Sequence, residues 1–144
     1  MPDGYLAVMI KRNAEKLLVV TGADLPSSLS GYALKVALRL DLDILVLFVA
    51  GSGEHLDAGQ RKKRIEQFTR EIEKDAASFT ILARRSEVRV TVVVDVGNQE
   101  EAVARLRAQE PSIRFILTEN PETGREEKNT TALPRITVVD NDLL

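Results

Sequence analysis

Apolar residues gather along this chain in five short runs, separated by stretches in which apolar residues recur every three or four positions. The runs cover residues 16–21, 43–50, 88–96, 113–118 and 135–140. The first two are continuous and rich in valine and leucine, which is typical of strands covered on both faces, because neither face meets water. The third begins with alternation of apolar and polar residues. We predict a strand at each of the five runs.

The intervening stretches have the period of an α-helix. A helix that starts near Ser27 or Ser28 has an apolar face made of Leu29, Ala33, Val36, Ala37 and Leu40. A longer helix over about 57–83 has an apolar face made of Ile65, Phe68, Ile72, Ala76, Phe79 and Leu82. A third, shorter helix is predicted in VGNQEEAVARLRAQEP, where Pro111 ends it.

Strands and helices therefore alternate as far as the fourth strand, and a loop joins that strand to the fifth. This order predicts an α/β sandwich with a mostly parallel sheet and right-handed crossovers. The chain has no internal repeat and no domain linker, so a single domain is predicted over residues 1–144. Residues 1–15 fall outside the alternation and are assigned to an N-terminal extension.

The charge and residue composition of the chain exclude several classes of function. The formal net charge of −2 gives no overall attraction to nucleic acid or to anionic lipid. The chain has no cysteine and one histidine, which excludes disulfides, thiolate chemistry and the usual zinc sites. No apolar run approaches the roughly 20 residues that span a bilayer. The N-terminus lacks the charge order of a secretory signal, so a cytoplasmic location without membrane insertion is predicted.

Three segments together resemble the universal stress protein family. They are KLLVVTGADLPSSLSGYALKVALRLDLDILVLFV, then VTVVVDVGNQEEAVARL, and a proline that leads directly into RITVVD. The resemblance covers roughly residues 16–140. It implies a three-layer sandwich of the adenine nucleotide alpha hydrolase-like type, with a five-stranded parallel sheet in the order 3-2-1-4-5. It also implies a cytoplasmic homodimer, often joined through the fifth strand.

Many members of that family bind ATP, with the adenine near the ends of strands one and two and the phosphates on a glycine-rich loop after strand four. Ligands of such folds lie at the carboxyl ends of the strands. The resemblance makes six residues candidates for nucleotide contacts: Thr21, Asp24, Ser27, Ser28, Val49 and Thr118. For the serines the alternative is capping, in which a hydroxyl oxygen accepts a hydrogen bond from a first-turn N–H. The sequence favours capping, which needs no ligand.

The stretch ENPETGREEKNTTALP stands where related proteins keep the phosphate loop and a helix. A phosphate cradle needs free backbone N–H groups, hence glycines, and nearby positive charge. This stretch has one glycine, Gly124, and four glutamates against Arg125 and Lys128. It predicts a solvated acidic connector and no tight binding of ATP.

The resemblance and this loop together predict a non-catalytic regulatory or stress-response protein that requires no cofactor or metal. The alternative is an adenine-nucleotide-binding protein or weak ATPase, in which TGAD (residues 21–24), Val49 and the serines replace the missing glycines. The fifth strand, RITVVD, is apolar and is predicted to lie at an edge of the sheet. Because an open edge tends to be paired or covered, we predict a homodimer through this strand, and a protein partner is a further possibility. A regulatory domain that serves a transporter is suggested only by the resemblance.

Other motifs have simpler explanations. Gly51, Ser52 and Gly53 resemble the start of a dinucleotide fingerprint whose third glycine is missing. His55 follows in the same loop without any serine or acid at a catalytic spacing, so an exposed histidine is predicted.

Two charged features have simple explanations as well. The basic cluster 61–64 has no aromatic residues interleaved for base stacking, and a solvated helix face with charge pairs along the helix is favoured over a nucleic-acid site. Asp95, at the end of the third strand, is comparable to a phospho-acceptor aspartate. A receiver domain also needs an acidic pair after its first strand, and only Asp24 is there.

Overall fold

The computed structural model describes residues 15–51, 56–119 and 135–138. Over these residues the chain forms, in order, β1 (Lys16–Thr21), α2 (Ser27–Leu40), β2 (Asp43–Ala50), α3 (Ala58–Arg85), β3 (Val90–Val96), α4 (Gln99–Gln109), β4 (Ile113–Thr118) and β5 (Arg135–Val138). The elements match the predicted ones, but β3 begins at Val90 rather than Val88. The amide of Val88 instead donates to the carbonyl of Ala83 and continues the turn that ends α3.

The five strands form one sheet in the order β3-β2-β1-β4-β5. The pairs β1–β2, β2–β3 and β1–β4 are parallel, whereas β5 is antiparallel to β4. The predicted order and the mostly parallel sheet are confirmed, but the fully parallel sheet implied by the family resemblance is wrong. Thr118 pairs with Arg135, so β5 starts at the end of the sheet where β4 stops. A parallel fifth strand needs a crossover to the opposite end of the sheet.

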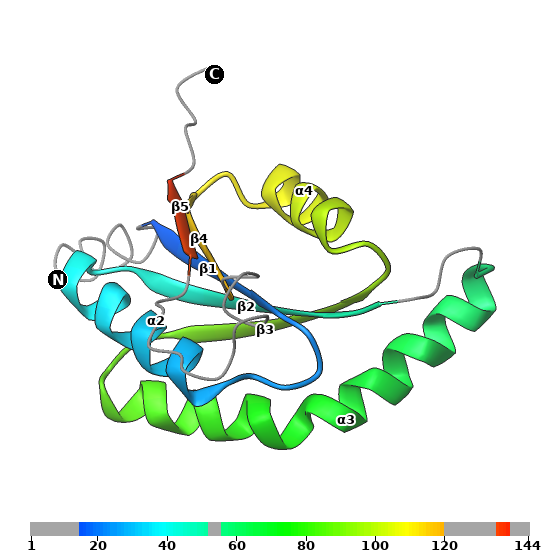
Figure 1. Cartoon of the computed structure of the whole chain (residues 1–144), viewed down its shortest axis with the longest axis horizontal. Coiled ribbons are helices and arrows are strands. Elements are labelled where there is room, and N and C mark those ends of the chain that lie inside the picture. The colour runs from blue at the N-terminus through cyan, green and yellow to red at the C-terminus, as the bar shows by residue number, and fades with distance from the viewer. Residues whose placement is uncertain (1–14, 52–55, 120–134, 139–144) are drawn as a thin grey trace, which may run out of the picture.

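The sheet is the middle layer of a three-layer sandwich, with α2 and α3 on one face and α4 on the other (Figure 1). Alternate residues of β2 supply both cores. Ile44, Val46 and Phe48 belong to the cluster that contains the α2 and α3 side chains, and Leu45 and Leu47 belong to the cluster under α4. This two-sided burial is the physical reason for the continuous apolar run in the sequence. No described helix is long and apolar enough to cross a bilayer.

Two residues predicted on buried helix faces are exposed. Leu40 is the last residue of α2, and the chain then turns through the left-handed residue Asp41, so that Leu42 is buried instead. In α3 the buried stripe passes through Ala83, and its neighbour Leu82 points outward. In both cases the helical period was predicted correctly, but the last turn of the stripe was displaced by one or two positions.

Candidate functional site

The carboxyl ends of β1, β2 and β4 lie together at one edge of the sheet, where a ligand is expected in this topology. Val20 pairs with Leu47 on one side and with Thr118 on the other, and Thr21 pairs with Phe48. The chain leaves β1 toward β2, while β4 lies on the other side of β1. Thr21 and Thr118 therefore flank the topological switch point, as the family resemblance implied.

The turn between β1 and α2 is held by two hydrogen bonds. Thr21 is buried, and its hydroxyl donates to the carbonyl oxygen of Asp24 over 2.8 Å. The next amide, that of Leu25, donates to the Asp75 carboxylate of α3 over 2.9 Å. The Thr21 hydroxyl thus uses its proton to close the turn, and a ligand could only donate to its oxygen. The Asp24 side chain is exposed.

Ser27 and Ser28 are exposed residues in the first turn of α2, and neither caps the helix. The N-cap residue is Pro26, which makes no side-chain cap hydrogen bond. The predicted serine cap is therefore wrong. The helix starts at Ser27, so both serines lie inside the first turn, whereas a capping residue must precede it.

Val49 and Thr118 are separated by β1. The Val49 side chain is buried in the core under α4, but the contact that the resemblance implies for Val49 is one of its backbone, and that contact stays a prediction. Thr118 is half-buried between Val20 of β1 and Arg135 of β5. Of the six candidates the fold brings Thr21 and Thr118 to adjacent strand ends, and no hydrogen bond within the described part of the chain joins the side chains of any two candidates.

Asp95 takes part in an ion cluster at the carboxyl end of β3. Its Oδ1 accepts from Arg61 of α3 over 2.5 Å and its Oδ2 accepts from Arg105 of α4 over 2.9 Å. The amide of Val96 also donates to Oδ1, over 2.7 Å. The carboxylate therefore ties the two helical layers to the sheet. Sequence reasoning missed this cluster, although an acid at the end of an apolar strand was a usable signal.

The basic cluster 61–64 differs from its predicted form. Arg61 bonds to Asp95 rather than to an acid of its own helix, and Arg64 lies over the ring of Phe68 at 5.7 Å from the centroid. No charge pair along α3 is formed among the described residues. The predicted helix-face pairs are therefore wrong, and for Arg61 the reason is that the first turns of α3 lie beside the carboxyl end of β3, where Asp95 is the partner. Lys62 and Lys63 are exposed, as predicted.

Within the described ranges, no three histidine, cysteine, aspartate or glutamate side chains come close enough to hold a metal ion. Ser52, Gly53 and His55 lie outside those ranges, as does most of the acidic connector, residues 120–134. Glu119, which begins the connector, is exposed. The predictions that rest on this loop chemistry stay predictions.

Comparison with known proteins identifies solved structures that share this fold. No family model matches the sequence, and no curated protein matches it either. A solved universal stress protein family structure from Burkholderia pseudomallei aligns with a TM-score of 0.54 and 11% identity, over 75% of this chain and 84% of that one. The universal stress protein UspA from Lactobacillus plantarum aligns with a TM-score of 0.53 and 15% identity, over 90% of each chain. The chain therefore resembles universal stress proteins in its fold.

Proposed function

We propose that this chain is a non-catalytic regulatory or stress-response protein of the universal stress protein type, which acts in the cytoplasm without tightly bound ATP. The proposal rests on the shared fold together with the chemistry of the carboxyl edge. The edge has the right topology for a nucleotide, but its polar groups are poorly suited to one.

The main supporting observation is the closed β1–α2 turn. The Thr21 hydroxyl donates its proton to the Asp24 carbonyl oxygen, so it cannot donate to a ligand. The exposed Asp24 carboxylate adds negative charge near the switch point. On the other side of the switch point, the exposed Glu119 follows Thr118 directly. Two carboxylates beside this edge repel a triphosphate. Arg61, near the start of α3, is already bonded to Asp95.

We expect thermal unfolding of the purified protein to be unchanged by ATP and magnesium at millimolar concentration. A ligand present at 100 times its dissociation constant adds about 2.7 kcal/mol of stability, which raises the unfolding midpoint by several degrees. A saturable rise in midpoint, or nucleotide carried through purification, would contradict the proposal.

The alternative is an adenine-nucleotide-binding protein or weak ATPase with an atypical phosphate site. One observation favours it: α2 begins without a side-chain cap, and the hydroxyls of Ser27 and Ser28 are exposed beside its first turn. If ATP does raise the midpoint, Ser28→Ala and Thr118→Val should each reduce the rise. An unchanged rise in both variants places the nucleotide elsewhere and removes this alternative.

We also propose that two copies pair through β5, the edge strand that follows β4. Its Ile136 is exposed although it is apolar, and Thr137 beside it is exposed as well. Light scattering after size exclusion should give a mass of at least a dimer. Ile136→Lys should lower that mass, because pairing of two β5 strands would bring like charges together, whereas Thr137→Ser should not change it. A monomeric wild-type protein would remove the β5 dimer.

A further inference from the structure

β3 is the edge strand on the side of the sheet opposite β5, and it also carries unpaired main-chain groups. The Ile44 amide donates to the Arg89 carbonyl, and the Gly97 amide donates to the Ala50 carbonyl. Odd-numbered residues of β3 therefore direct their main-chain groups at β2. The even-numbered Val90, Val92 and Val94 direct theirs away from the sheet, and no described residue pairs with them.

The open part of the edge has a defined end. The outward amide of Val96 already donates to the carboxylate of Asp95 over 2.7 Å. A strand that adds to β3 must therefore stop before Val96. What stays available is the five-residue segment Val90–Val94, in which three residues present both an N–H and a C=O.

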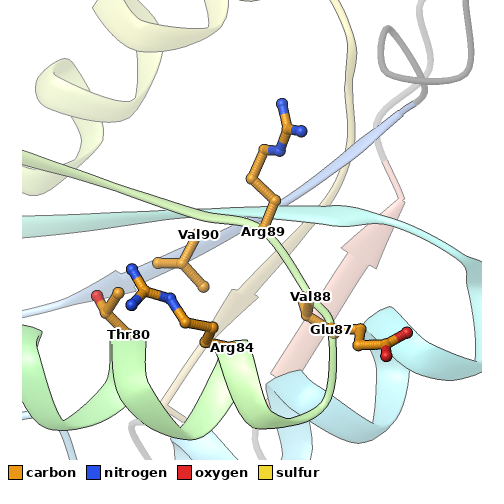
Figure 2. Close-up of a pocket in the computed structure, with 6 residues that line it drawn as sticks. All are labelled: Thr80, Arg84, Glu87, Val88, Arg89 and Val90. Atoms are coloured by element: carbon orange, nitrogen blue, oxygen red, sulfur yellow. The ribbon is translucent and has the colours of Figure 1, made fainter. Parts of the chain in front are cut away.

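Apolar surface adjoins the open segment. A groove of about 500 Å³ lies between α3 and β3, and Ile72, Ala76, Ala77, Ile81, Val92 and Val94 supply its apolar lining. Ile81 is 52% exposed and Val92 is 36% exposed. A second hollow of about 330 Å³ continues along the start of the strand. Figure 2 shows Arg84 directed toward Val90 there, whereas Arg89 points to the opposite side of the strand. An unpaired edge beside an apolar groove is a surface for adding another strand.

The sequence of β3 favours a second copy of the same strand as the occupant. Residues 88–96 read VRVTVVVDV, and positions at equal distance on either side of Val92 complement each other. Val90 is matched by Val94, and Arg89 is matched by Asp95. An antiparallel pair with its two-fold axis at Val92 therefore places each Arg89 opposite Asp95 of the second copy.

The same axis satisfies the free main-chain groups. Val92 of one chain pairs with Val92 of the second copy. Val90 of each chain pairs with Val94 of the other. Each such pair exchanges two N–H···O bonds, so the three pairs form about six hydrogen bonds. The register that joins the complementary charges is thus also the register that pairs every outward residue from Val90 to Val94.

The groove is filled in this arrangement. Side chains of paired residues point to the same face of a sheet, and the even-numbered valines of β3 lie on the α3 face. Val92 of the second copy therefore enters the groove under α3, and the exposed Ile81 of each copy faces the axis. Asp95 already bonds to Arg61 and Arg105, so the added Arg89 sets the register more than it adds strength. Arg89 itself has no ion pair with any described residue.

We propose that the β3 edge is a self-association surface, through which two copies of the chain pair antiparallel about Val92. This inference is independent of nucleotide binding. It adds a second edge to the proposed β5 dimer, and a protein that pairs at both edges forms a continuous sheet longer than a dimer.

A set of edge variants tests both surfaces separately. Sedimentation velocity is measured on the full chain at several concentrations for Ile136→Lys, Val92→Lys and the double variant, with circular dichroism to verify that each is folded. Val92→Lys places two lysines opposite each other on the axis, and like charges directly opposite destabilise a strand pair. Ile136→Lys alone is expected to be a dimer through β3, and the double variant a monomer. A monomeric Ile136→Lys protein overturns the β3 proposal, whereas a monomeric Val92→Lys protein overturns only the β5 dimer.

Two further variants, made in the Ile136→Lys background, separate pairing from folding. Val92→Thr keeps a β-branched residue at the axis, so the dimer should persist. Arg89→Glu changes an exposed residue without an ion pair, and it places an anion instead of a cation opposite the Asp95 carboxylate of the second copy. It should raise the dimer dissociation constant only about threefold, because Asp95 is already shared with Arg61 and Arg105. A dissociation constant that Arg89→Glu leaves unchanged overturns the register about Val92.

Discussion

Replacement of Phe48 by alanine is expected to lower the free energy of unfolding by about 3–5 kcal/mol. Phe48 lies in β2, pairs with Thr21 of β1 and Val94 of β3, and is fully buried in the core between the sheet and helices α2 and α3. Removal of its ring loses apolar burial and leaves a cavity that β2, held between two strands, cannot collapse to fill. The loss is a large part of the 5–15 kcal/mol typical of a domain.

Urea unfolding followed by circular dichroism measures this loss, at one protein concentration because association adds stability. Leu38→Ala is the matched control, since Leu38 of α2 is 55% exposed. Its effect should stay within about 0.5 kcal/mol. If the two variants unfold at the same urea concentration with equal slopes, Phe48 does not lie in the packed core.

Replacement of Asp95 by asparagine should lower the free energy of unfolding by about 1–2 kcal/mol. The Asp95 side chain is 18% exposed and accepts from both Arg61 and Arg105. Asparagine keeps the shape but leaves two arginines close together without an anion. The expected loss is small for hydrogen bonds to charged groups, because both arginines are partly solvated. The difference from wild type should shrink in high salt, which screens the charges.

The control for Asp95→Asn is Glu15→Gln. Glu15 pairs with Arg114 at 2.8 Å, and both side chains are about half exposed. A surface pair of this kind contributes about 0–1 kcal/mol. Equal losses in the two variants would show that the Asp95 cluster contributes no more than an ordinary surface ion pair and does not join the helical layers.

The helical stripes were predictable except at their ends. Phe68, Ile72 and Phe79 face the sheet as the three- and four-residue spacing predicted. Leu40 and Leu82 were misplaced, because helical period alone does not show where a helix leaves the sheet. Leu42 is buried because the chain turns after Leu40, and Ala83 is buried because the α3 stripe steps four residues on from Phe79.

The candidate site was predicted in outline and missed in detail. The strand ends that hold Thr21 and Thr118 followed from the alternation of elements and the family resemblance, since parallel strands end at a common edge. The roles of the side chains did not follow. The bond from the Thr21 hydroxyl to the Asp24 carbonyl depends on how the turn folds. The Asp95 cluster joins residues from α3, β3 and α4 that no sequence spacing relates.

The sequence by itself determined the elements, their order and the class of the sheet, because the continuous apolar runs at 16–21 and 43–50 can be buried only in a sheet covered on both faces. The tertiary structure alone decided the direction of β5, the partners of Asp95 and the open edge at β3. These features depend on which segments meet in space. The pattern of apolar and polar residues along the sequence indicates which residues are buried, but it does not indicate which neighbouring residues bury them.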